Sequence, residues 1–136
     1  MKDSELIQAD AAVAPRVTMA DIEAGIASEH YFTGQHGVDG AFIKLELHQR
    51  HADTDTAKEK APPPPYESLS LLTFCILVLR NGFMVTGESA CASPANFNAE
   101  MGRKIARENA VSKVWPLLGY ELKSKLAASG PQGSAP

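Results

Sequence analysis

Four basic side chains, Arg103, Lys104, Arg107 and Lys113, fall within eleven residues of a segment with helical character. Arg103 and Arg107 are one helical turn apart, so both guanidinium groups project from the same side of a helix. Such a pair can bind a carboxylate or a phosphate through several N–H donors. Ser93 precedes a proline, which predicts a helix start, where free backbone N–H groups attract anions. These five residues are therefore the candidate ligand-binding residues, and the ligand expected for them is an anion.

Each of these residues also has a purely structural alternative. The arginines can pair with Glu100, Glu108 or the acidic N-terminal part of the chain, and Ser93 can simply cap its helix. The charge is indeed uneven, because residues 1–70 carry 6 basic and 12 acidic side chains and residues 94–128 carry 6 basic and 3 acidic ones. This distribution indicates either an anionic partner for the C-terminal part or complementarity within the chain or between subunits.

Catalytic and metal-binding groups are placed less favourably. Ser89 and Cys91 lie close to Glu88, but no histidine occurs in residues 52–136 to activate a nucleophile. We therefore predict no catalytic residue and do not expect an enzyme. Four side chains of the types that bind metals lie in a predicted loop, with a spacing that matches no specific metal motif: His48, His51, Asp53 and Asp55. Neither a metal nor another cofactor is expected.

The 136-residue chain has the length of one ordinary domain, and its 44% hydrophobic content is enough for a core without disulfides. Only Cys75 and Cys91 are present, and both are expected to be reduced and packed as small apolar groups. No apolar run approaches the roughly 20 residues that span a bilayer, and the acidic N-terminus is unlike a signal peptide. We expect a soluble cytoplasmic protein without a membrane partner. A net charge of −3 also makes duplex DNA an improbable ligand.

The elements that would position the basic residues predict an α+β fold. Asn81-Gly82 separates two apolar arms, which is typical of a β-hairpin with a two-residue turn. The strands are expected at about 71–80 and 83–89, with Val78 opposite Val85 and Cys75 opposite Glu88. One face is then wholly apolar and is the expected core face: Phe74, Ile76, Val78, Phe83 and Val85. The other face is mixed and is expected to meet another part of the chain or a second subunit.

One long helix, at about 94–115, is expected to cover the hairpin. It begins after Ser93 and ends before Pro116, because proline disrupts a helix interior. Its apolar wedge on the helical wheel is expected to face the core: Phe97, Met101, Ile105, Val111 and Trp115. A separate row of small residues allows close approach of another backbone, either the hairpin or a symmetry-related helix: Gly102, Ala106 and Ala110.

Residues 1–50 are expected to form an attached N-terminal part. Thr18 and Asp21 match a capping box with Asp in place of Glu, which predicts a helix at about 19–30. Alternating apolar residues predict a possible strand at about 41–48, although a short helix also fits.

The whole chain is expected to form one compact domain. Residues 51–68 contain four consecutive prolines and are interpreted as a stiff connector. Residues 69–128 form the hairpin–helix core unit, and residues 129–136 are interpreted as a disordered tail.

Residues 71–120 contain a series of short blocks in a specific order. An apolar strand is followed by NGF, GESAC, P-x-NF, GRKIA, K-x-W and PL-x-GY. This series resembles the signature of small tailed-phage and prophage accessory proteins of the “gene product forty-nine”-like family. Residues 16–32, RVTMADIEAGIASEHYF, extend the resemblance. The resemblance implies a virus or prophage origin and a dispensable accessory role, and it supplies neither catalytic residues nor a mechanism.

These observations favour a non-enzymatic phage accessory protein that acts by binding in the cytoplasm of the infected host cell. A homo-oligomer would bring the basic helices together around an anionic, nucleotide-type ligand, so that the protein sequesters it as a counter-defence factor. Two alternatives remain open. The protein can inhibit a host protein by direct contact, or it can bind single-stranded nucleic acid.

Overall fold

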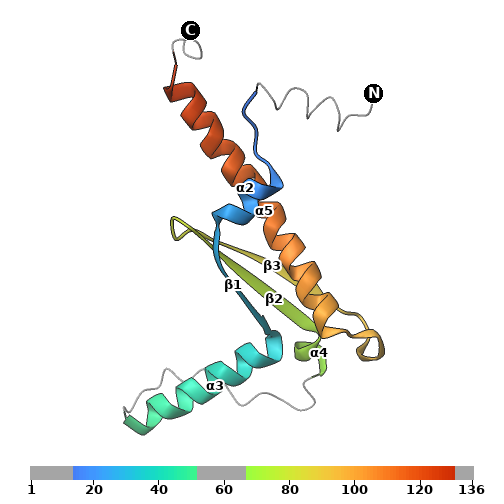
Figure 1. The fold of residues 1–136 in the computed structure, drawn as a ribbon. Coiled ribbons are helices and arrows are strands. Elements are labelled where there is room, and N and C mark those ends of the chain that lie inside the picture. Colours follow the sequence, from blue (N-terminus) through green and yellow to red (C-terminus); the bar gives the residue numbers. More distant parts are fainter. Residues whose placement is uncertain (1–13, 52–66, 131–136) are drawn as a thin grey trace.

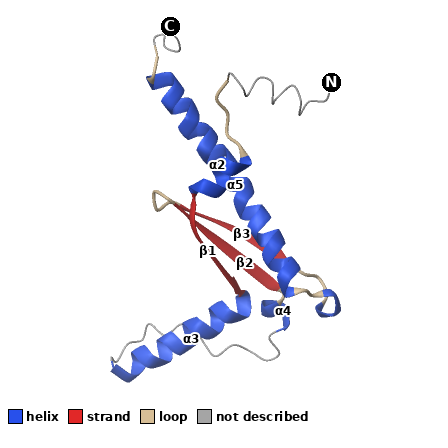
Figure 2. Ribbon diagram, in the orientation of Figure 1, coloured by secondary structure: helices blue, strands red, loops and turns tan. Residues whose placement is uncertain are grey.

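The computed structural model describes residues 14–51 and 67–130, and of residues 45–51 and 67 it describes the backbone alone. A three-stranded antiparallel sheet of order β1–β2–β3 lies at its centre. The strands are β1 (Ile26–Thr33), β2 (Leu72–Leu79) and β3 (Met84–Ala90). The long helix α5 (Ala99–Ala128) covers one face of the sheet, so the predicted α+β class is confirmed (Figure 2).

Shorter elements connect these parts. Helix α2 (Met19–Gly25) precedes β1, and α3 (Gly34–His51) follows it. The single turn α4 (Glu67–Ser70) precedes β2, and the 3-10 turn η1 (Pro94–Asn96) lies between β3 and α5. Figure 1 shows that α5 extends past the sheet beside α2, whereas α3 points away from the opposite end of the sheet.

The capping box predicted at Thr18 is present, but the helix after it is shorter than expected. Thr18 Oγ1 accepts a hydrogen bond from the Asp21 N–H at 3.2 Å, and Asp21 Oδ2 accepts one from the Thr18 N–H at 2.8 Å. The helix ends at Gly25, and residues 26–33 form an edge strand that pairs with β2. The predicted helix at about 19–30 is therefore wrong in its second half, because aromatic and β-branched side chains favour strand pairing there.

The strand predicted at about 41–48 is wrong as well, because these residues lie inside α3. A second capping box starts this helix. Thr33 Oγ1 accepts a hydrogen bond from the His36 N–H, and His36 Nδ1 accepts one from the Thr33 N–H, both at 3.1 Å. The capping residues and several strong helix formers outweigh an alternation that spans only a few residues. Most of the predicted proline-rich connector and tail lies outside the described residues.

The turn between β2 and β3 has three residues instead of two. The Leu79 N–H donates to the Phe83 carbonyl at 2.7 Å, and the Gly82 N–H donates to the Leu79 carbonyl at 2.9 Å. Gly82 has a φ of 90°, a left-handed conformation that costs glycine little. This is a tight turn followed by a glycine bulge. The pairing shifts by one residue, so Leu77 lies opposite Val85 and Cys75 opposite Gly87, and the predicted register is wrong.

Helix α5 covers the face of β2 that was expected to be mixed. The buried side chains of this strand are Thr73, Cys75, Leu77 and Leu79. The intervening residues of the predicted core face, Phe74, Ile76 and Val78, are only partly buried on the uncovered side. Phe83 is 55% exposed, and only Val85 of the predicted core face is buried. Both faces of β2 are apolar, so alternation alone could not decide which of them the helix covers.

The row of small residues on α5 explains this choice. Gly102, Ala106 and Ala110 are buried against the hairpin, which confirms the first of the two partners expected for the row. A Cβ atom added to Gly87 would overlap the Ala106 carbonyl oxygen and the Ala110 nitrogen, so two backbones are in direct contact there. The predicted apolar wedge is wrong, because Met101, Ile105 and Trp115 are exposed and only Val111 of that wedge is buried.

The bounds of α5 also differ from those predicted. Its N-cap is Asn98, whose side chain accepts a hydrogen bond from the Met101 N–H at 3.0 Å. Ser93 instead precedes η1 and makes no side-chain capping bond. Pro116 lies inside the helix, which continues to Ala128. Proline removes one backbone hydrogen bond, and packing of the two following leucines, Leu117 and Leu118, against the core offsets this loss.

Candidate functional site

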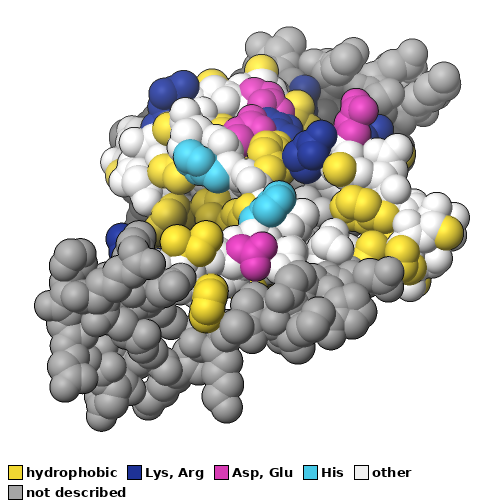
Figure 3. All heavy atoms as spheres, turned by 90° about the horizontal axis from the view of Figure 1, so that it is seen from below, with side chains coloured by type: hydrophobic (Ala, Val, Ile, Leu, Met, Phe, Trp, Pro, Cys, Tyr) yellow, Lys and Arg dark blue, Asp and Glu magenta, His cyan; other side chains and the backbone are white. Residues whose placement is uncertain are grey.

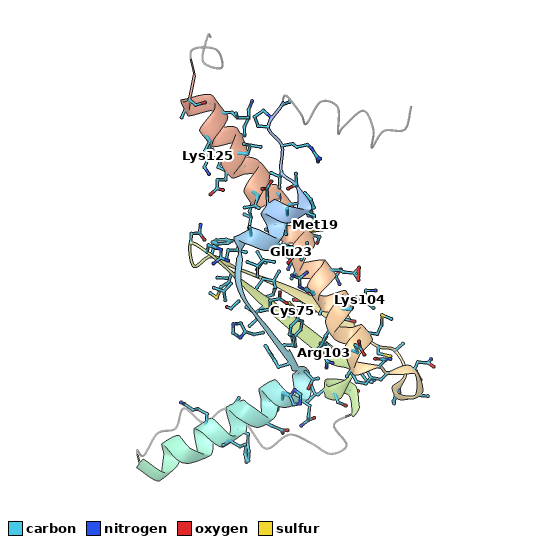
Figure 4. All side chains as sticks on the ribbon, viewed as in Figure 1. Met19, Glu23, Cys75, Arg103, Lys104 and Lys125 are labelled. Atoms are coloured by element: carbon cyan, nitrogen blue, oxygen red, sulfur yellow. The ribbon has the colours of Figure 1, made fainter. Side chains whose placement is uncertain are left out.

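The five candidate ligand-binding residues lie in different surroundings. Arg103 lines a pocket at the end of the sheet, whereas Lys104 borders a separate hollow with Asn98. Figure 4 shows Arg103 near the start of α5, close to the point where β1 runs into α3. Lys113 is exposed further along the helix, and Ser93 lies in the loop before η1. The structure therefore does not bring the five side chains together in one place.

Arg107 is occupied by two carboxylates of the N-terminal part. Its Nε and Nη2 donate to Glu29 Oε1 and Oε2, each at 3.0 Å. Its Nη1 and Nη2 donate to Glu23 Oε2 at 3.1 Å and to Glu23 Oε1 at 2.7 Å. This arrangement is the structural alternative considered for Arg107, and it ties α5 to α2 and β1.

The carboxylate of Glu29 has a second donor, because the Tyr31 hydroxyl donates to its Oε1 at 2.7 Å. Hydrogen bonds from Arg107 and then from Tyr31 lower the pKa of Glu29. Burial and the bond to Glu29 raise the pKa of Tyr31, and burial raises the pKa of the Cys75 thiol. Cys75 therefore stays protonated at neutral pH, and its environment is that of a packed core residue.

A pocket of about 330 Å³ lies where β1, α3, α4, β2 and the start of α5 meet. Its volume is within the range of small-molecule sites, roughly 300–1,000 Å³. Arg103 contributes the positive charge. Among the residues whose side chains the structure describes, its side chain has no hydrogen-bond or ion-pair partner. The remaining chemistry comes from aromatic and hydrogen-bonding side chains: Tyr31, Phe32, Phe97, Gln35 and His36.

This set of side chains suits a ligand that carries both a ring and an anionic group. Aromatic side chains stack on flat rings, and a guanidinium group binds a phosphate or carboxylate. The first residues of α3 also line the pocket; the His36 N–H is already bonded to Thr33 Oγ1, so the helix start contributes through its dipole. The positive end of the α3 dipole and Arg103 thus act on the same space.

The face of the molecule seen in Figure 3 shows hydrophobic side chains and histidines side by side. This is the end of the molecule at which β1 runs into α3 (Figure 1). Phe32 stacks on Phe74, with ring centroids 5.2 Å apart. Over residues 14–51 and 67–130, the structure contains no group of three or more His, Cys, Asp or Glu side chains that could hold a metal ion. Within the same ranges, no helix is long and apolar enough to cross a membrane.

Sequence reasoning identified Arg103 but missed the rest of the pocket. Gln35 and His36 lie in a stretch with three glycines just beyond the helix predicted at about 19–30, and glycine is a poor helix former, so no helix start was predicted there. The available signal was the spacing of Thr33 and His36, which is that of a capping box with histidine in the fourth position.

Comparison with known proteins supports the relationship seen in the sequence. The model of the phage protein (N4 Gp49/phage Sf6 gene 66) family matches residues 17–126, which contain the whole sheet and most of α5. Neither the comparison with curated proteins nor the comparison with solved structures gives a match. The family match confirms the resemblance of residues 71–120 and its extension to the segment that forms α2 and β1. The chain belongs to the phage protein (N4 Gp49/phage Sf6 gene 66) family.

Proposed function

We propose that this phage protein acts by binding a nucleotide-type anion in the pocket beside Arg103. The observation that carries the proposal is the combination, in one pocket, of a guanidinium group and three aromatic side chains. The phosphate of the ligand binds to Arg103 and faces the start of α3. Its base packs against the aromatic side chains Phe32 and Phe97.

Sequestration is the activity that this arrangement supports best. A protein that sequesters a ligand needs affinity and no reactive group. His36 Nδ1 accepts the hydrogen bond of the α3 capping box, which occupies that nitrogen, and Cys75 is buried with a raised pKa. A phage accessory protein of this kind acts during infection by lowering the free concentration of a nucleotide signal used in host defence.

Thermal unfolding against a panel of nucleoside monophosphates, triphosphates and cyclic nucleotides tests the proposal. A ligand present at 100 times its dissociation constant adds about 2.7 kcal/mol to the stability of the folded protein. We expect the Arg103→Met variant to lose at least about ten-fold in affinity for the ligand identified in this way. Lys113→Met is the matched control, because Lys113 is exposed and lies about 15 Å further along the helix axis.

Two results would contradict the proposal. The first is the absence of binding to any nucleotide in the panel. The second is an equal loss of affinity in the Arg103→Met and Lys113→Met variants, because this would show that only the overall charge of α5 matters. Titration calorimetry on the same samples gives the stoichiometry, which shows whether each chain binds its own ligand.

A further inference from the structure

We infer that Gln35 selects the ligand, by accepting a hydrogen bond from an N–H group of the base. This inference rests on the proposed function and adds to it the kind of base edge that the pocket prefers. Arg103 and the aromatic side chains do not discriminate between bases, because every nucleotide has a phosphate and every base has a flat face. Discrimination requires a polar group with a fixed orientation, and Gln35 provides one.

The orientation of the Gln35 amide is determined by its neighbour on α3. Gln35 Nε2 donates to Asp39 Oδ1 at 2.8 Å, one helical turn further on. A carboxylate only accepts hydrogen bonds, so the amide nitrogen must face Asp39. The oxygen of the same amide is thereby directed away from Asp39. The opposite orientation of the amide, with oxygen and nitrogen exchanged, would place the amide oxygen against the Asp39 carboxylate, and both of these groups are acceptors.

Gln35 Oε1 is buried and has no hydrogen-bond partner. In the part of the chain that the structure describes, every other buried side-chain nitrogen or oxygen has a hydrogen-bond partner. A buried acceptor without a partner is rare in folded proteins, because it has lost water and gained nothing in exchange. Its residue lines the pocket that also holds Arg103. A donor on the ligand would restore the missing bond.

The missing partner has to be a donor, which narrows the edge of the base that can face Gln35. Adenine, guanine and cytosine carry exocyclic amino groups, and guanine, uracil and thymine carry a ring N–H, whereas other edges of the same bases have only acceptors. The oxygen is covered in the chain without ligand, so binding includes a shift of the side chains around it. A base that has only acceptors on this edge would leave the Gln35 oxygen unpaired after that shift.

A pair of nucleotides that differ in a single donor tests this inference. Adenosine 5′-monophosphate and purine riboside 5′-monophosphate share the phosphate, the ribose and the fused ring, and only the first has the amino group. We expect the wild-type chain to bind the adenine nucleotide about ten-fold more tightly, which corresponds to about 1.4 kcal/mol. In the Gln35→Met variant, which keeps the length of the side chain and removes the acceptor, the two nucleotides should bind equally.

The outcomes separate this inference from the proposed function. Equal affinities in the wild type, with binding that still depends on Arg103, would overturn the role of Gln35 and leave nucleotide binding intact. If no nucleotide binds at all, the role of Gln35 and the proposed function both fail. A ten-fold preference that persists in Gln35→Met would assign the selection to another group. Thermal unfolding of Gln35→Met without ligand verifies that the variant is folded.

Discussion

Replacing Arg107 by methionine should lower the free energy of unfolding by about 2 kcal/mol. Both pairs are bidentate, and they differ in exposure. In the pair with Glu29 the two side chains are 27% and 35% exposed, so hydrogen bonds to charged groups there contribute about 1.5 kcal/mol. The Glu23 side chain is 49% exposed, and solvent screening reduces the contribution of its pair to about 0.5 kcal/mol. Methionine retains most of the aliphatic stem, so the change reports mainly the loss of the guanidinium group.

Urea unfolding of Arg107→Met, Glu29→Gln, Glu23→Gln and the two double variants measures these contributions separately. The double-mutant cycles should give a coupling energy of about 1.5 kcal/mol between Arg107 and Glu29, and about 0.5 kcal/mol between Arg107 and Glu23. Lys113→Met is again the control, since it removes an exposed charge from the same helix and should change stability by less than about 0.5 kcal/mol.

A coupling energy that is larger for Glu23 than for Glu29 would refute this reasoning, because the expected order follows from the greater exposure of Glu23. A change of less than about 0.5 kcal/mol for Arg107→Met would refute the structural role altogether. If that variant instead lost nucleotide affinity at unchanged stability, Arg107 would belong to the ligand site expected from its spacing with Arg103.

Three further predictions concern other parts of the molecule. Because the pKa of Glu29 is lower in the folded state than its ordinary value of 4.5, Glu29 stabilises the fold above pH 4.5, and this stabilisation is lost as the pH falls through the lower folded value. When the free energy of unfolding is measured as the pH is lowered, Glu29→Gln should therefore lose less stability than the wild type, and an identical loss of stability would contradict the lowered pKa. Gly87→Ala should lower the free energy of unfolding by about 3 kcal/mol or more, or prevent folding, because its Cβ would overlap the α5 backbone. Gly119→Ala, whose Cβ meets open space within a helix, should instead raise the free energy of unfolding by about 0.5–1 kcal/mol, measured by thermal unfolding. Equal effects of the two variants would mean that the helix does not pack on β3 as described. An aromatic disulfide reagent should modify Cys91 and leave Cys75 unmodified until the chain unfolds; two rapidly reacting thiols in the native protein would contradict the burial of Cys75.

Local patterns in the sequence predicted local structure well. The capping box at Thr18, the existence of the hairpin and the contact row on α5 all depend on residues a few positions apart. The covered face of β2 could not be predicted in this way, because Phe74 and Ile76 are as apolar as Leu77 and Leu79. The decisive residue is Gly87 on the neighbouring strand, which lets the α5 backbone approach one side of the sheet. Its effect becomes visible only with the correct register.

The same distinction applies to the candidate site. Arg103 was identifiable because basic residues on a helix are conspicuous in a sequence. Gln35 was not, since its importance depends on a pocket that also includes residues more than thirty positions further along the chain. The strand β1 was missed for a related reason, because its partner β2 begins about forty residues further on and residues 26–30 also fit a helical pattern.

The distance in sequence between β1 and β2 has a consequence for the order of folding. Thr33 pairs with Thr73 and Ile26 with Leu79, so β1 joins the sheet by closing a loop of 40 to 53 residues, whereas β2, β3 and α5 follow one another directly. Contacts that close long loops form late. We therefore expect the hairpin and α5 to associate first and β1 to dock last, together with the Arg107 bridge and the Tyr31–Phe32 wall of the pocket. A nucleotide in this pocket would then bind only after the transition state for folding, so it would slow unfolding much more than it accelerates folding.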